Sequence, residues 1–192
     1  MAKLLAFAGS ARKDSINKKL ITVAAQGATD AGAEVTLIDL ADYPMPLFDQ
    51  DLESAEGLPP KARELKQLMI EHDGFMIASP EYNSAFSPLL KNALDWISRA
   101  ESNEEPPLAA FRGKTAALMA TAPGALGGIR GLVFLRMLLG NIGVHVIPQQ
   151  HAVPNGFTVF AEDGSMTDEK HKQAVQNLAK SLTEFSDKLN KD

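Results

Sequence analysis

Short apolar runs alternate with longer segments of helical period along almost the whole chain, and this alternation constrains the fold more than any other feature. Leu4 to Ala8 is an uninterrupted apolar run, and similar runs cover residues 74–79 and 114–121. Strands that are apolar at every position are typical of parallel sheets with both faces covered. The pattern therefore predicts an α/β protein with a parallel sheet wrapped by helices.

Five strands and five helices account for most of the sequence. We expect the strands at residues 4–8, 34–40, 74–79, 114–121 and 144–148. We expect the helices at residues 17–29, from 60, 87–99, 129–141 and from 168 onward. Residues 43–60, with four prolines and several acids, are expected to form one long loop.

Several residues mark the helix ends. Gly32 follows the first helix, where a residue without Cβ suits the left-handed conformation, and Ser87-Pro88 is a cap followed by proline at the first helical position. The last helix is expected to bury one stripe of residues: Val175, Leu178, Ala179, Leu182, Phe185 and Leu189.

Composition excludes several classes of function. The 192 residues suit a single domain, 1–192, and the net charge of −5 disfavours nucleic acid as a partner. The absence of cysteine excludes disulfides, thiolate zinc sites and thiol nucleophiles. The sequence predicts no metal site, because the four histidines are dispersed and the acidic run at 49–53 lacks calcium-loop spacing.

The N-terminus does not predict export. Ala6-Phe7-Ala8 imitates a cleavage site, but only Leu4 and Leu5 separate Lys3 from it, whereas a signal peptide needs an apolar stretch of roughly 7–15 residues. No run approaches the ~18 apolar residues that cross a bilayer. We therefore expect a cytoplasmic protein without a membrane role.

The loop after the first strand carries the strongest chemical signal. Residues 9–17 offer Ser10, Ser15, Asn17 and Arg12 around a helix N-terminus, a combination that suits a phosphate dianion. The loop lacks the Gly-Lys-Ser/Thr of a P-loop and the chain lacks G-x-G-x-x-G, which favours one terminal phosphate over a pyrophosphate. A polar turn with Ser15 as a helix cap is the alternative.

Two further loops follow the third and fourth strands. Pro80-Glu81-Tyr82-Asn83 adds an aromatic ring and backbone polar groups, which suit a flat heterocycle. The segment 123–128 holds three glycines, which allow backbone to approach a ligand closely. Each segment is alternatively a simple turn. Because the carboxyl ends of parallel strands share one edge, we expect the three loops to converge there.

Four motifs in order and in register resemble the family of NADPH-dependent FMN reductases, which includes bacterial quinone, azo-dye and chromate reductases. The motifs are Gly9-Ser10-x-Arg12-x-x-Ser15-x-Asn17, Pro80-Glu81-Tyr82-Asn83, Leu90-Lys91-Asn92-Ala93-Leu94-Asp95-Trp96 and Gly124-x-x-Gly127-Gly128-x-Arg130. The resemblance spans nearly the whole chain. It implies a flavodoxin-like, three-layer, doubly wound sheet of five parallel strands in the order 2-1-3-4-5.

The resemblance also implies an FMN site. The residues expected to contact FMN are Ser10, Arg12, Ser15, Ile16, Asn17, Pro80, Glu81, Tyr82, Asn83, Thr121 and Gly124. Among them, the Ser10 to Asn17 group would hold the phosphate, residues 80–83 would line the isoalloxazine, and the Gly124 loop would lie at its other edge. Many relatives carry a serine just before the Pro-Gly pair, where this chain has Ala122, with Thr121 one position earlier.

The expected activity follows from the cofactor. We expect hydride transfer from NADPH or NADH, by way of FMN, to free flavin, quinones or other small acceptors, by a ping-pong scheme. No side chain is expected to be catalytic, because the flavin carries the chemistry. Two alternatives remain: a flavin-binding electron carrier without its own turnover, and a flavin-free α/β regulatory module.

Two helical segments have structural interpretations. In residues 90–96 we expect Trp96 to pack and Asn92 and Asp95 to tie neighbouring loops. Residues 129–142 are apolar around almost the whole circumference, which indicates burial on more than one side. We expect a subunit interface there, with Arg130 and Arg136 pairing across it, in a dimer or tetramer, as the resemblance also implies; cover by the chain's own loops is the alternative.

Overall fold

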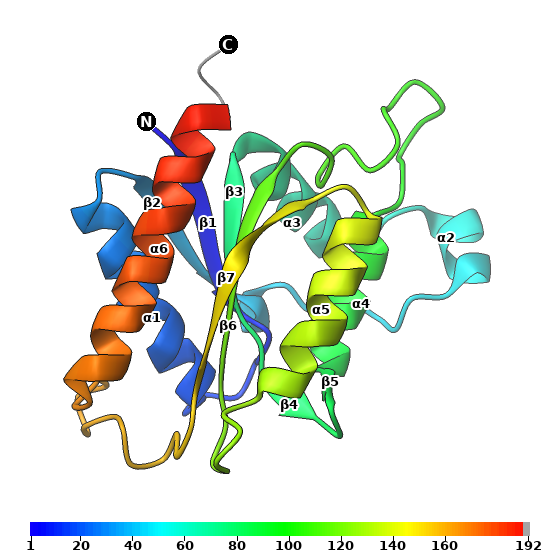
Figure 1. Cartoon of the computed structure of the whole chain (residues 1–192). Coiled ribbons are helices and arrows are strands. Elements are labelled where there is room, and N and C mark those ends of the chain that lie inside the picture. The colour runs from blue at the N-terminus through cyan, green and yellow to red at the C-terminus, as the bar shows by residue number, and fades with distance from the viewer. Residues whose placement is uncertain (190–192) are drawn as a thin grey trace.

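A twisted parallel sheet forms the centre of the molecule (Figure 1). The computed structural model describes residues 1–189. The strands lie in the order β2-β1-β3-β6-β7, which confirms the predicted strand order and fold class. They are β1 (Lys3–Ala8), β2 (Glu34–Asp39), β3 (Gly74–Ala78), β6 (Thr115–Thr121) and β7 (His145–Val153).

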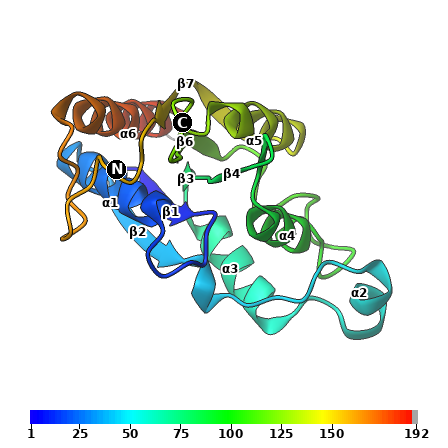
Figure 2. The same cartoon turned by 90° about the horizontal axis from the view of Figure 1, so that it is seen from below.

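Helices cover both faces of this sheet (Figures 1 and 2). One face carries α1 (Ile16–Asp30) and α6 (Glu169–Leu189), and the other carries α3 (Pro60–Glu71), α4 (Pro88–Ile97) and α5 (Ile129–Asn141). Successive side chains of a strand point to opposite faces, so Leu4 and Ala6 pack under α1 and α6, whereas Leu5 and Phe7 pack under the other three helices. Both faces therefore bury an apolar core.

The predicted helix ends are confirmed. Gly32 has φ +92° just beyond α1, and Ser87 accepts a hydrogen bond from the Leu90 N–H with Pro88 as the first residue of α4. Trp96 is fully buried, and its Nε1 donates to Pro46 O together with Asn92 Nδ2. Asn92 thus ties a neighbouring loop as expected, but Asp95 bonds to Lys91 within α4.

The prediction of one long loop over residues 43–60 was wrong. After a 3-10 turn, η1 (Leu40–Asp42), the segment contains helix α2 (Gln50–Glu56), which lies at the periphery in both views (Figures 1 and 2). Asp49 caps it by accepting hydrogen bonds from Asp51 N and Leu52 N. No residue of α2 is buried, so the sequence has no apolar period there to reveal it.

Strand β7 extends further than predicted, through Pro148 to Val153. Its register against β6 slips between the pairs Ala116–Val146 and Leu118–Gln150. Proline lacks a backbone donor and is tolerated in edge strands and at bulges, so Pro148 does not end this strand.

Two other expectations needed correction. Within the predicted stripe of α6, Phe185 and Leu189 are 39% and 42% exposed, because the buried face of the last turns is formed by Thr183 and Ser186 instead. The two arginines of α5 pair inside the chain: Arg130 bonds to Glu81, and Arg136 bonds to Gln150 and to carbonyls of β7.

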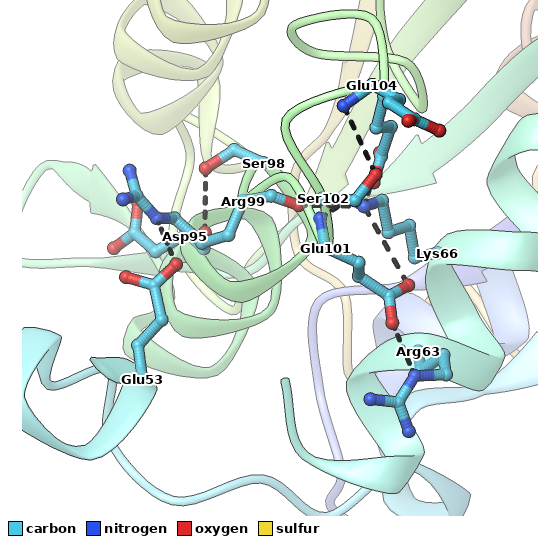
Figure 3. Close-up of polar contacts among 10 residues, drawn as sticks. Glu53, Arg63, Lys66, Asp95, Ser98, Arg99, Glu101, Ser102 and Glu104 are labelled. Carbon is cyan, nitrogen blue, oxygen red and sulfur yellow. Dashed lines mark hydrogen bonds and ion pairs between the residues drawn. The ribbon is translucent and has the colours of Figure 1, made fainter. Parts of the chain in front are cut away.

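Polar side chains of α2, α3 and the segment after α4 form a network around Lys66 of α3 (Figure 3). The Lys66 ammonium is almost fully buried and contacts Glu105 and, at 2.7 Å, the Arg99 carbonyl. Arg99 in turn pairs with Glu53 of α2 at 2.7 Å. These pairs fasten α2 and the segment after α4 to the body of the molecule. Among residues 1–189, no helix is long and apolar enough to span a bilayer.

Candidate FMN site

A cavity of about 210 Å³ lies at the carboxyl edge of the sheet, among the loops that follow β1, β3, β6 and β7. Its lining consists of Ser10, Arg12, Ser15, Ile16, Asn17, Pro80, Glu81, Tyr82, Thr121, Ala122, Pro123 and Phe157. The predicted site residues therefore gather around one cavity, with two exceptions, Asn83 and Gly124. Ligands of doubly wound sheets bind at this edge.

The first wall is the N-terminus of α1. Ser15 occupies the cap position in an extended conformation, but its side chain makes no capping hydrogen bond. The first N–H groups of a helix have no intrahelical acceptor and carry partial positive charge. Ser10 lies beside them, where its hydroxyl accepts a long hydrogen bond of 3.4 Å from Arg12 N. Hydroxyls, free amides and the exposed Arg12 together suit an anion.

Asn17 lines the cavity, and its side-chain amide bonds to the end of β6. Its Nδ2 donates to Thr121 O and its Oδ1 accepts from Thr121 N, both at 3.0 Å. The side chain is 2% exposed. This pair of bonds holds the end of β6 against the start of α1. An asparagine amide has two N–H donors, so the phosphate contact expected of Asn17 stays a prediction.

Thr121 likewise faces the protein. Its hydroxyl donates to Val153 O at 2.9 Å, which ties β6 to the end of β7. The neighbouring residue Ala122 lines the cavity without a hydroxyl. On this wall the polar groups offered to a ligand are therefore backbone groups.

The loop after β3 forms a small hairpin that the sequence did not predict. Strands β4 (Glu81–Tyr82) and β5 (Ala85–Phe86) pair through a two-residue turn in which Asn83 and Ser84 both have positive φ. Two-residue hairpins favour this left-handed geometry, and asparagine adopts it readily. The turn keeps Asn83 outside the cavity, while Tyr82 lines it and stays 53% exposed.

Glu81 accepts hydrogen bonds from the free N–H groups at the N-terminus of α5. Its carboxylate accepts hydrogen bonds from Arg130 N and Gly131 N, at 3.0 and 3.1 Å, and from the Arg130 guanidinium. The cap residue Gly128, at φ +90°, has no side chain to do this. Burial raises the pKa of the Glu81 carboxyl, but the Arg130 and Gly131 hydrogen bonds outweigh it and lower the pKa overall.

The glycine-rich segment after β6 packs against the protein more than against the cavity. A Cβ on Gly127 would lie 2.7 Å from the Val153 carbonyl carbon, so only glycine fits there. Gly124 lies in open space, and its carbonyl accepts from Gly127 N. Backbone therefore approaches closely at Gly127, against the end of β7, and the approach to a ligand that was expected of this segment stays a prediction.

Three lining residues were absent from the predicted set: Ala122, Pro123 and Phe157. The first two directly follow Thr121, so the strand end itself was the available signal. Phe157 belongs to the loop between β7 and α6, for which the sequence shows no motif. Its place follows from Gly156, whose N–H donates to Ala122 O at 2.9 Å.

A larger groove of about 580 Å³ runs along α1, α6 and residues 162–166. Three lysines line it, but Lys18 pairs with Asp39 at 2.5 Å and Lys19 donates to the Ala161 carbonyl. None of the predicted site residues lines it. The smaller cavity therefore carries the chemistry expected from the sequence.

Comparison with known proteins shows the family of this chain. Residues 2–158 match the family model of the NADPH-dependent FMN reductases. An NAD(P)H:quinone oxidoreductase of Solanum tuberosum is 33% identical over 97% of this chain and 94% of its own length. An NAD(P)H-dependent FMN reductase of Pseudomonas aeruginosa is 30% identical over 94% of this chain and 92% of its own length.

A solved structure supports the same assignment. FerB, a flavoenzyme NAD(P)H:(acceptor) oxidoreductase from Paracoccus denitrificans, superimposes with a TM-score of 0.79 at 28% identity, and the match covers 98% of each chain. The family model and the relatives all extend over the strands and loops that build the cavity. The chain therefore belongs to the NADPH-dependent FMN reductase family.

Proposed function

We propose that this protein is an NAD(P)H-dependent oxidoreductase that binds FMN at the carboxyl edge of its sheet and reduces quinones, free flavin or other small acceptors. The observation that carries the proposal is the open N-terminus of α1. There, Ser15 makes no capping hydrogen bond, and the first residues of α1 line a cavity together with Ser10 and Arg12. We also propose that residues 1–192 form one FMN-binding domain and that the protein is located in the cytoplasm.

The residues present fit FMN. A phosphate dianion needs several donors, and Ser10, Ser15, Arg12 and the amides of α1 supply them. When bound, FMN supplies a ring that accepts a hydride from NAD(P)H and returns two electrons to the acceptor. The N-terminus of α1 would hold the phosphate, and Tyr82 lines the same cavity with an aromatic ring.

No side chain is needed as a chemical acid or base in this proposal. Glu81, the carboxylate among the lining residues, is committed to the N-terminus of α5, and hydrogen bonds from Arg130 and Gly131 lower its pKa. It stays ionised at neutral pH and positions the loop that carries Tyr82. Donor and acceptor use the same open side of the cavity in turn, which gives ping-pong kinetics.

The test is an anaerobic absorbance titration of FMN-loaded protein with NADPH, and with NADH in parallel. We expect the band near ~450 nm to bleach quickly and to recover when a quinone is added, with the faster donor being the physiological one. FMN that bleaches only with dithionite would support an electron carrier instead. A protein that binds no FMN would overturn the site assignment.

We further propose that α5 forms a contact between two copies of the chain. Val133, Phe134 and Met137 on its outer side are 57%, 46% and 66% exposed, and no loop among residues 1–189 covers them. Contiguous exposed apolar side chains are typical of subunit interfaces. A dimer or tetramer is expected in sedimentation, and Met137→Glu should yield monomers. Leu126 is 55% exposed and lies outside α5, so Leu126→Glu serves as the control for added surface charge. Unchanged sedimentation of Met137→Glu would contradict this interface.

A further inference from the structure

Phe157 lies on the loop between β7 and α6 and exposes most of its ring at the cavity. The ring is 67% exposed and belongs to the cavity lining. Two neighbours on the same loop behave differently, because Val159 is buried and Phe160 packs against the core under α1 and α6. The loop therefore buries two apolar residues and presents the third to the cavity.

The turn that carries Phe157 is tightly held. Gly156 N donates to Ala122 O, and Thr158 N donates to Asn155 O, both at 2.9 Å. A Cβ on Gly156 would lie 2.5 Å from both Ile16 Cδ1 and Thr121 Oγ1, so only glycine allows the loop to approach this closely. Asn155 adopts φ +53° to make the turn. The position of Phe157 is thus set by the same segments that form the cavity.

A second aromatic ring borders the same cavity from another element. Tyr82 of β4 is 53% exposed and lines the cavity together with Phe157. The cavity volume of about 210 Å³ is below the ~300–1,000 Å³ that usually encloses a small-molecule ligand. A ligand held by the polar groups inside must therefore extend to the mouth, where the two rings lie.

We propose that Phe157 determines specificity for the electron acceptor, by offering an apolar face to flat ring compounds such as quinones. The inference rests on the proposed function and concerns the second substrate. Aromatic rings attract one another through offset or edge contacts and gain from removal of apolar surface from water. A hydrated, octahedral anion such as ferricyanide has no flat face and gains nothing from Phe157.

The experiment compares four FMN-loaded proteins: wild type, Phe157→Ala, Phe157→Tyr and Phe185→Ala. Phe185 is a matched control because it is an exposed phenylalanine, 39% accessible, on α6 and outside the cavity lining. The first readout is calorimetric binding of menadione to the oxidised protein without any electron donor. The second is KM and kcat with menadione and with ferricyanide, and the third is the Kd of FMN from its fluorescence.

We expect Phe157→Ala to raise the Kd and KM of menadione about tenfold, through loss of ring contact and apolar cover. The kinetic constants for ferricyanide should stay within about twofold of wild type, since this acceptor has no flat face to contact Phe157. The loss of FMN affinity should be smaller than the loss of menadione affinity, because the donors at the N-terminus of α1 also hold FMN. Phe157→Tyr should restore menadione binding, because it keeps the ring, and Phe185→Ala should match wild type.

Three results would overturn the inference alone. They are unchanged menadione binding in Phe157→Ala, an equal loss in Phe185→Ala, and a parallel tenfold loss of FMN affinity in Phe157→Ala, which would assign the ring to the cofactor. A wild-type protein that binds no FMN would instead overturn the proposed function and this inference with it.

Discussion

Helices α1 and α4 both begin at a serine near the carboxyl edge of the sheet, but their N-termini are satisfied differently. Ser87 of α4 accepts from Leu90 N and donates to Gly9 O at 2.6 Å, so it is fully engaged within the chain. Ser15 of α1 caps no N–H group. Both serines are buried, with exposures of 2% and 4%, so burial does not distinguish them.

The N-terminus of α5 provides a third case. Its cap residue Gly128 has no side chain, and the carboxylate of Glu81 takes the role from a distant loop. Two of these three helix starts are therefore completed by the protein, and the third opens into a cavity. Unpaired donors at a helix start attract anions, and of these three N-termini only that of α1 leaves its donors for the phosphate that we propose there.

The largest expected effect comes from filling the open N-terminus of α1 with Ser15→Asp. Aspartate is a strong cap, so its carboxylate would take the place proposed for the phosphate and repel it. We expect FMN affinity to fall about 100-fold, or about 2.7 kcal/mol, while the unfolding free energy of the apoprotein rises by about 0.5 kcal/mol.

Fluorescence titrations with FMN and with riboflavin check this prediction. Riboflavin lacks the phosphate, so its affinity should change by less than about threefold, since the added charge has no anion to repel. Equal losses for both flavins would show that Ser15 contacts the ring or the ribityl chain.

A second test exchanges the two serines for alanine, one at a time. Ser87→Ala should lower the unfolding free energy by about 1–2 kcal/mol, because a cap and a buried bond to Gly9 are lost. Ser15→Ala should lower FMN affinity about tenfold, with a stability loss below about 0.5 kcal/mol.

Urea unfolding and FMN titration on both variants give the complete comparison. We expect Ser87→Ala to affect mainly the unfolding free energy and Ser15→Ala to affect mainly the affinity for FMN. If Ser15→Ala destabilises the apoprotein as much as Ser87→Ala does, the two N-termini are equivalent and the proposed distinction fails.

The α5 N-terminus predicts a pH dependence. The pKa of Glu81 is lowered from its usual 4.5, so its contribution to stability is fully present above that pH and is lost as pH falls through the folded-state pKa. At pH 7, Glu81→Gln should be less stable than wild type by about 1 kcal/mol, and the difference should narrow below pH 4.5.

Urea unfolding of both proteins between neutral and acidic pH measures this difference. Glu184→Gln is the control, because Glu184 forms only a 3.9 Å surface pair with Lys180. If the difference in unfolding free energy between wild type and Glu81→Gln stays constant with pH, the charge of Glu81 is not the cause of that difference.

The smallest effect is expected from Arg12→Gln. Arg12 is exposed, so solvent and salt screen its attraction to the phosphate. We expect about a threefold loss of FMN affinity at low salt that disappears near 1 M salt. The same FMN titration in a salt series tests this, and a loss independent of salt would indicate a direct, dry contact.

Local signals explain which parts of the fold were predictable. Continuous apolar runs identified the three inner strands β1, β3 and β6. The Ser87-Pro88 and Gly32 signals marked helix ends, because backbone sterics and capping act over a few residues. Helix α2 was missed because it buries nothing. The hairpin at residues 81–86 was missed because its two-residue strands are too short to show a period.

The sequence by itself determined the α/β class, the convergence of the loops on one sheet edge and most residues around the cavity. The class and the convergence depend on short-range periodicity, turn chemistry and the rule that parallel strands end together, whereas the full set of cavity residues came from the resemblance of four motifs to the NADPH-dependent FMN reductases. Tertiary structure alone decided how side chains are used: Asn17 holds Thr121, Glu81 completes α5, and Phe157 reaches the cavity. These contacts join segments far apart in the chain, and a polar side chain is available to a ligand only where no such partner occupies it.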